Sequence, residues 1–190
     1  MSFRILAGMA VLATAIACDK MDSPTAPADA ASLALSASQG TQSQSHERQV
    51  IMSDACDPET FNAVLGPNSC VRNGGVTFDH FIAQLTRMER VPSWFFAPPN
   101  ATARVGDEFV VWNKGGETHT FTEVDDFGGG IVPSLNALMH LSTVAPECTT
   151  LAPEDFVRAG GTYREDISEA GLEKYQCCIH PWMRLEARIR

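Results

Sequence analysis

The segment from Tyr175 to Arg184 contains three metal-ligand residue types at regular spacing. Cys177, His180 and Met183 stand at positions i, i+3 and i+6. A tight loop at this spacing can turn a thiolate, an imidazole and a thioether toward one point. Thiolate and imidazole bind copper strongly, and a thioether is a soft ligand that favours the cuprous state. Zinc more often takes four Cys or His ligands without Met, so this set favours an ion that cycles between Cu(I) and Cu(II).

A trigonal copper site with one cysteine needs two imidazoles, and His119 is the best candidate for the second. It stands in the segment Thr118 to Val124, whose alternating residues predict a strand after the glycines 115 and 116. The chain has three further histidines, for which solvation is the simpler interpretation: His46, His80 and His140.

Two blocks of sequence resemble the cupredoxin family, the blue copper proteins related to plastocyanin and amicyanin. The first block runs from Val105 to Asn113 and continues from Glu117 to Phe121. The second is the segment Tyr175 to Arg184, whose short C-x-x-H-P-x-M loop is similar to that of amicyanin. With the strands between the blocks, the resemblance covers residues 94–190. The chain departs from the family pattern at Cys178 and Leu185 and in its longer insertions.

The resemblance implies one type 1 copper ion per chain, held by His119, Cys177, His180 and Met183. It implies one-electron transfer without bond making, with Met183 as a weak axial ligand that tunes the potential. Thr120 follows the first histidine directly and is a candidate for a residue that orients the ligands.

The resemblance also implies a route for the electron. In the family the later histidine reaches the surface through an apolar patch, and here that residue is His180. Pro181 and Trp182 flank it, although Trp182 fits a role in the core equally well.

The adjacent cysteines Cys177 and Cys178 must have different roles. Cys177 keeps the family spacing to His180, and neighbours on a strand point to opposite faces. Cys178 then faces away and can pair with Cys148, or both can be buried free thiols.

Six cysteines stand in the chain. The stretch with Cys56 and Cys70 is interpreted as an irregular loop, residues 50–75, closed by a disulfide. If Cys18 carries lipid and one cysteine binds metal, four remain for two disulfides, which an oxidising compartment allows.

The first 17 residues have the pattern of a targeting signal. Arg4 is the only charge before a small and apolar run, which is shorter than the roughly 20 residues that span a bilayer. The run ends in Ala15-Ile16-Ala17-Cys18, which resembles a bacterial lipobox, with plain cleavage after Ala17 as the alternative. We therefore expect an exported protein on the periplasmic or outer-surface side, attached to the membrane only through a lipid at Cys18.

The remaining chain divides into a tether and one domain. Residues 18–49 are small and polar and predict a flexible tether. Residues 50–190 predict an all-β domain, a cupredoxin-like Greek-key β-sandwich with an N-terminal extension, residues 50–93, a short N-terminal helix and loop insertions. The helix is predicted at about 77–88 and a long loop with one helical turn at 125–160. Strands are predicted at residues 94–96, 109–112, 118–124, 162–167, 173–177 and 185–189.

The net charge and the number of histidines argue against two classes of function. The net charge of −9 excludes a nucleic-acid partner, because no basic patch is present. We expect a monomer that exchanges electrons with a redox protein such as a c-type cytochrome or a membrane oxidoreductase. An enzyme is not expected, since a second copper would need more histidines. The alternatives are a periplasmic copper delivery or resistance protein and a disulfide-stapled adhesion domain without metal.

Overall fold

The computed structural model describes residues 46–190. The predicted signal segment and nearly all of the predicted tether lie outside the described residues. No helix within residues 46–190 is long and apolar enough to cross a membrane.

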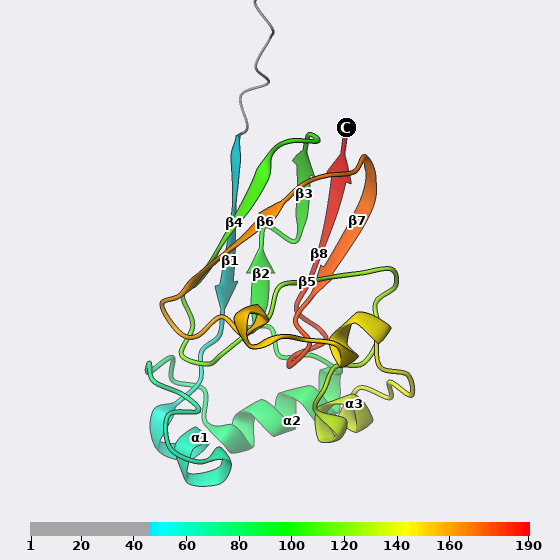
Figure 1. Ribbon diagram of the computed structural model, residues 1–190. Coiled ribbons are helices and arrows are strands. Elements are labelled where there is room, and N and C mark those ends of the chain that lie inside the picture. Colours follow the sequence, from blue (N-terminus) through cyan, green and yellow to red (C-terminus); the bar gives the residue numbers. More distant parts are fainter. Residues whose placement is uncertain (1–45) are drawn as a thin grey trace, which may run out of the picture. The chain divides into compact units, whose positions relative to one another are not determined.

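The domain is built from two four-stranded sheets (Figure 1). One sheet has the strand order β2-β1-β4-β6, with bounds Phe95–Ala97, Glu47–Ser53, Glu108–Asn113 and Thr162–Asp166. The other has the order β3-β8-β7-β5, with bounds Asn100–Ala103, Arg184–Ile189, Gly171–Gln176 and Thr122–Val124. The predicted all-β sandwich with loop insertions is confirmed.

The core lies between the two sheets because alternate side chains of each strand face inward. In β8, Leu185, Ala187 and Ile189 are buried, whereas the residues between them are at least partly exposed. Phe109 of β4 meets Tyr175 of β7 across the core, with ring centroids 5.4 Å apart in an edge-on arrangement. This geometry is favourable for aromatic pairs and ties one sheet to the other.

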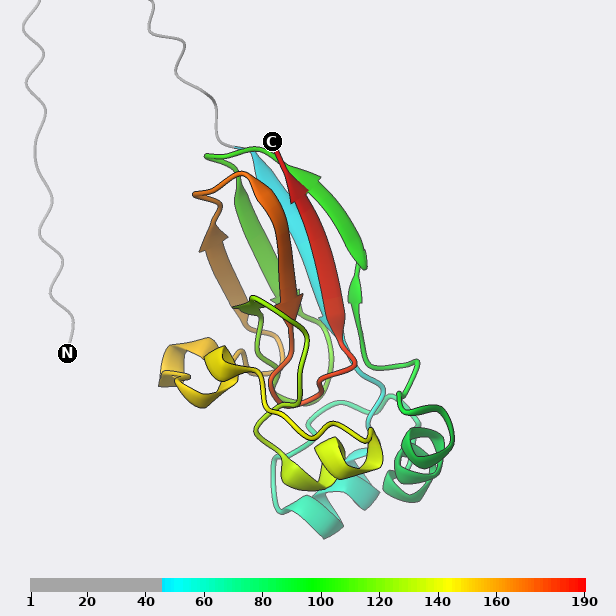
Figure 2. The ribbon, with the colours of Figure 1, turned by 90° about the vertical axis from the view of Figure 1, so that its right-hand side faces the viewer.

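Three helices gather at one end of the sandwich, away from the C-terminus (Figures 1 and 2). They are α1, Pro58–Leu65, α2, Phe78–Met88, and α3, Pro133–Leu138. The Asp57 side chain accepts from the N–H of Thr60 at the start of α1, and Thr77 accepts from His80 at the start of α2. Such N-caps satisfy backbone donors that the first turn leaves free. The helix predicted at about 77–88 is confirmed.

The prediction of an irregular loop over residues 50–75 is wrong in two respects. Strand β1 begins at Glu47, inside the predicted tether, and runs through Ser53 in parallel with β4. Helix α1 occupies part of the remaining loop. The sequence pattern did not reveal β1 because the strand follows a polar stretch and pairs with strands far along the chain, among them β4 some 60 residues later.

The strand predicted over residues 118–124 is shorter in the structure, where β5 covers only Thr122–Val124. His119 lies before β5 and makes an isolated bridge with Val157. The helical turn predicted near residues 135–140 corresponds to α3. Strand β3 was not predicted, since its sequence Asn-Ala-Thr-Ala carries no large apolar residue.

Two disulfides join the four cysteines as the sequence allowed. Cys56 pairs with Cys70, and Cys148 pairs with Cys178. Cys177 is the free cysteine among residues 46–190, and it is buried.

Candidate metal centre

The ligand loop connects β7 to β8 at the helical end of the sandwich. Its ends are joined by a backbone bond from the N–H of Cys177 to the carbonyl of Met183, 3.0 Å long. A second bond, from the N–H of Met183 to the carbonyl of His180, measures 2.9 Å. The loop is therefore closed on itself, and its Cys, His and Met are all buried.

The long insertion holds this loop from outside. The Cys148–Cys178 disulfide attaches the insertion to the residue next to Cys177. The N–H of Ile131 also donates to the carbonyl of Cys178 at 2.7 Å. The ligand loop is thus fixed by β7, by β8 and by the insertion.

His119 is positioned by a hydrogen-bonded loop after β4. Its backbone exchanges two bonds with Val157, 3.1 and 2.8 Å long. The buried side chain of Asn113 donates to the carbonyls of Glu117 and Val157, both at 2.8 Å. These bonds fix the backbone on either side of His119, whose side chain is fully buried.

Three donor atoms from these two segments converge. The Nδ1 atoms of His119 and His180 lie 3.2 Å apart, and each lies 3.8 Å from Sγ of Cys177. Among the His, Cys, Asp and Glu side chains of residues 46–190, these three form the one group of ligand atoms close enough to hold a metal ion. Met183 is buried in the same loop, with its backbone paired to Cys177.

The thiol of Cys177 lies in surroundings that favour its ionised form. Burial alone would raise its pKa, but the hydrogen bonds and charges of His119 and His180 outweigh burial and hold the pKa well below its usual value. The backbone N–H of Thr120 also points at Sγ, at 3.4 Å. A thiolate is the form in which cysteine binds metals.

Thr120 lies beside the cluster, as the sequence suggested. Its hydroxyl accepts a hydrogen bond from the N–H of Cys178 at 2.8 Å, while its own N–H faces Cys177. It therefore joins the loop of His119 to the ligand loop.

The second ring nitrogen of His119 faces a carboxylate. Nε2 lies 2.9 Å from Oδ2 of Asp54, and both side chains are fully buried. Burial would lower the pKa of His119, but the bonds and charges of Asp54 and Cys177 raise it to about 9. Burial would raise the pKa of Asp54, yet His119 and the backbone donors of Glu117 and Gly116 lower it to about 2.

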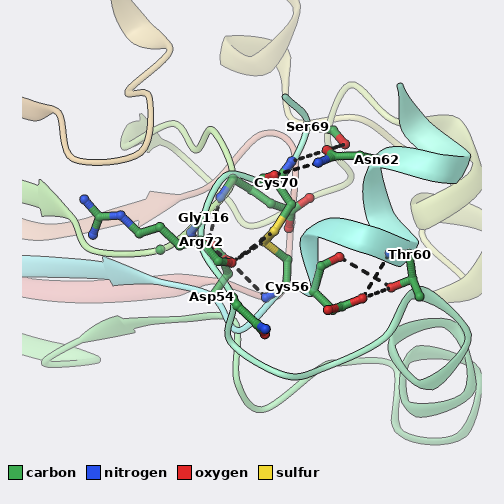
Figure 3. The surroundings of a disulfide bond; sticks show 12 residues. Asp54, Cys56, Thr60, Asn62, Ser69, Cys70, Arg72 and Gly116 are labelled. Atoms are coloured by element: carbon green, nitrogen blue, oxygen red, sulfur yellow. Dashed lines mark hydrogen bonds between the residues drawn. A yellow bond between two sulfur atoms is a disulfide. The ribbon is translucent and has the colours of Figure 1, made fainter. Parts of the chain in front are cut away.

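Asp54 is enclosed by the loop that precedes His119. The N–H groups of Gly116 and Glu117 donate to its two oxygens, each at 3.0 Å. A Cβ atom at Gly115 would collide with this carboxylate, and one at Gly116 would lie 2.6 Å from Sγ of Cys56. Figure 3 shows Asp54 beside the Cys56–Cys70 disulfide, with Gly116 next to it. The two glycines are thus needed for the close approach.

The second ring nitrogen of His180 also faces a carboxylate. Nε2 lies 3.6 Å from Oε2 of Glu117, which is ion-pair range but longer than a hydrogen bond. The indole N–H of Trp94 donates to the same oxygen at 2.6 Å. Burial raises the pKa of Glu117, and His180 and Trp94 only partly offset this effect.

The prediction that His180 reaches the surface is wrong. The residue is 3% exposed. An apolar cavity of about 190 Å³ lies against it, lined by residues of α1, α2 and α3 such as Phe61, Phe81 and Leu135. The helices of the extension and of the insertion cover this end of the domain, which the family resemblance did not include.

The remaining histidines do not join the cluster. His140 is exposed, 4.0 Å from Glu89, and His80 lies in the first turn of α2. Sequence reasoning missed Asp54, Glu117 and Trp94. Glu117 had one signal, its place two residues before His119, whereas nothing local marks Asp54 or Trp94.

No protein-family model and no curated protein matches this chain. Among solved structures, the chain is similar to a purple cupredoxin from Nitrosopumilus maritimus, at 16% identity and a TM-score of 0.41. The match covers 75% of this chain and 98% of that one. It is also similar to a Cu(I) amicyanin mutant, at 21% identity and a TM-score of 0.34, over 50% of this chain and 73% of that one. A reduced amicyanin mutant matches at 20% identity and a TM-score of 0.34, over 53% of this chain and 78% of that one. The inference of a metal centre rests on the side chains of this chain.

Proposed function

We propose that the chain binds one copper ion in a type 1 site and carries single electrons outside the cytoplasm. The observation that carries this proposal is the convergence of Nδ1 of His119, Nδ1 of His180 and Sγ of Cys177 from two distant segments. When bound, copper supplies one-electron chemistry between Cu(I) and Cu(II).

The donor set fits copper better than zinc. Two imidazoles and one thiolate with a weak axial Met make up the blue-copper ligand set, whereas structural zinc takes four Cys or His ligands. Met183 is the axial ligand in this proposal, and its burial in the closed ligand loop supports that role.

Both histidines present Nδ1 to the cluster and Nε2 to a carboxylate. Metal-binding histidines usually donate their second N–H to such a group. This arrangement supports a metal site over a chance meeting of buried side chains.

The protein's own contribution to electron transfer is rigidity and exclusion of water. The ligand loop is fixed by two backbone bonds, a disulfide and two strands, so its donors keep their places when the charge of the ion changes. With His180 buried, the exit for the electron in this proposal is Trp182, a partly buried residue whose ring centroid lies 5.3 Å from that of His180.

The sequence and the disulfides support a place for the proposed carrier outside the cytoplasm. Two disulfides suit an oxidising compartment, in line with export and a lipid anchor at Cys18. The partner in this proposal is a redox protein such as a c-type cytochrome or a membrane oxidoreductase. The net charge of −9 favours a basic docking surface on it, and the carrier acts as a monomer.

Replacing the thiolate tests the proposal. The copper-loaded parent should show the intense visible band of cysteine-to-copper charge transfer, with one copper per chain. Cys177→Ser should abolish the band, because a hydroxyl does not supply the thiolate donor. The double variant Cys148→Ser with Cys178→Ser keeps Cys177 and should still show a charge-transfer band, at a shifted position because the ligand loop loses its attachment to the insertion.

Two results would count against the proposal. A blue band that survives Cys177→Ser would show that another residue supplies the thiolate. More than one tightly bound copper per chain would favour a copper-handling protein over an electron carrier.

A further inference from the structure

Both histidines of the cluster are backed by a buried carboxylate. Oδ2 of Asp54 lies 2.9 Å from Nε2 of His119, and Oε2 of Glu117 lies 3.6 Å from Nε2 of His180. The four side chains are at most 8% exposed, so water screens these charges weakly.

Neither carboxylate belongs to the ligand loop. Asp54 directly follows β1, far from Cys177 in sequence. Glu117 is held by Trp94, which lies between α2 and β2 and packs on Phe81 with ring centroids 4.9 Å apart. The contact of Asp54 therefore depends directly on the N-terminal extension, residues 50–93. The contact of Glu117 depends on it indirectly, through Trp94, which directly follows the extension and packs on Phe81 within it.

We propose that Asp54 and Glu117 are positioning residues for the two copper-binding histidines, so that the N-terminal extension forms part of the metal centre. This inference rests on the proposed function. Asp54, by accepting the Nε2–H of His119, fixes the tautomer in which Nδ1 is free to bind metal and makes the imidazole a stronger donor. Glu117 lies beyond hydrogen-bond distance from His180 and acts on it through its charge.

The two carboxylates also bias the redox state. A buried anion attracts Cu(II) more strongly than Cu(I), because the attraction grows with the charge of the ion. Asp54 and Glu117 therefore stabilise the oxidised form and lower the reduction potential.

The structure ranks the two residues. Asp54 makes a short contact with His119 and is itself held by three backbone N–H groups, those of Cys56, Gly116 and Glu117. Glu117 contacts His180 at a longer distance and is held by one indole N–H. Asp54 has the larger effect.

Charge-neutralising variants of the full chain test this proposal. Asp54→Asn and Glu117→Gln are compared with Asp126→Asn, which removes the same charge from a side chain that is 92% exposed. The measurements are Cu(I) and Cu(II) affinities from chelator competition and the midpoint potential from a redox titration.

We expect Asp54→Asn to weaken Cu(II) binding by about 10- to 100-fold, the usual range for groups that orient metal ligands. Glu117→Gln should weaken it less. Cu(I) binding should fall less than Cu(II) binding in both variants, so the potential should rise, by about 59 mV for each tenfold difference. Asp126→Asn should match the parent.

A second pair of variants separates positioning from folding. Asp54→Asn turns an amide NH2 toward backbone N–H donors, which destabilises the fold. Thermal unfolding of the copper-free protein is therefore measured alongside, to separate this loss from the effect on copper. Glu117→Gln keeps an oxygen for Trp94, and Trp94→Phe keeps Glu117 while removing the indole donor. Trp94→Phe should shift the potential in the same direction as Glu117→Gln, by a smaller amount.

The results that would overturn this inference differ from those that would overturn the proposed function. A parent that binds no copper overturns the proposed function. A parent with the blue band, whose Asp54→Asn and Glu117→Gln variants keep the potential of Asp126→Asn, overturns the positioning role alone. Equal losses for Cu(I) and Cu(II), with no change in potential, overturn it too, because they indicate a purely structural contribution.

Discussion

A buried aspartate side chain lies at each end of strand β1, and the two aspartates bind different kinds of side chain. At the helical end, Asp54 accepts hydrogen bonds from the N–H groups of Cys56, Gly116 and Glu117. At the opposite end, Asp107 accepts from the N–H groups of His46 and Arg104. Both carboxylates thus satisfy backbone donors at the ends of strands, which is a structural task.

The remaining partner separates the two residues. Asp107 binds the guanidinium of Arg48, whose side chain is 38% exposed and always charged. Asp54 binds the imidazole of His119, which is fully buried and turns its other nitrogen toward a thiol. The same device stabilises the fold at one end of the sandwich and fixes a candidate metal ligand at the other.

The largest expected effect is the loss of stability on removing Asp54. Asp54→Ala leaves three backbone donors and the imidazole of His119 without an acceptor in a buried place. We expect the free energy of unfolding of the copper-free protein to fall by about 3–5 kcal/mol, the range for breaking a buried polar pair. Urea unfolding followed by circular dichroism measures this loss.

Asp107→Ala is the matched control for that measurement. Its loss should be clearly smaller, because Arg48 is partly exposed and can turn to water. Equal losses at the two positions would mean that the imidazole partner adds nothing to the role of Asp54.

Within the candidate metal centre, the sequence predicts the ligands better than the carboxylate that supports them. Cys177, His180 and Met183 could be recognised because their spacing is local, and His119 because it lies in a block that resembles the family. The contact between Asp54 and His119 depends on β1 pairing in parallel with β4, which brings residue 54 beside residues 115–117. No local pattern records such a pairing.

The strands of the sandwich were predictable where inward and outward residues alternate, as in β8. The burial of His180 was not, because it depends on how α1, α2 and α3 dock on the ligand end. Amphipathic spacing predicts that α2 is a helix with one apolar face, but not which part of the domain that face covers.

A smaller effect is expected at acid pH, where protonation of Asp107 should reduce the stability of the fold. Burial would raise the pKa of Asp107, but the backbone bonds and Arg48 hold it below the usual 3.8. The carboxylate therefore stabilises the fold fully above the unfolded pKa, and this contribution is lost as the pH falls through the lower folded pKa.

The variant Asp107→Asn tests that dependence in the copper-free protein. At neutral pH it should be less stable than the parent, and the difference should shrink progressively as the pH falls below about 4. Urea unfolding at a series of pH values measures the difference. A gap that stays constant down to pH 2 would mean that Asp107 contributes through shape rather than charge. The visible band of the copper-loaded variant should equal that of the parent.

The smallest expected effect is the coupling between the two ends. The seven residues of β1 span about 23 Å at the usual rise of a strand, and the two aspartates share no partner. Losses at sites this far apart usually add to within ~0.5 kcal/mol. The double variant with Asp54→Ala and Asp107→Ala should therefore lose the sum of the single losses, as measured by the same urea unfolding. A coupling well above that limit would show that β1 transmits strain from one carboxylate to the other. The candidate metal centre would then depend on the far end of the sandwich, and the division between a structural and a chemical end would fail.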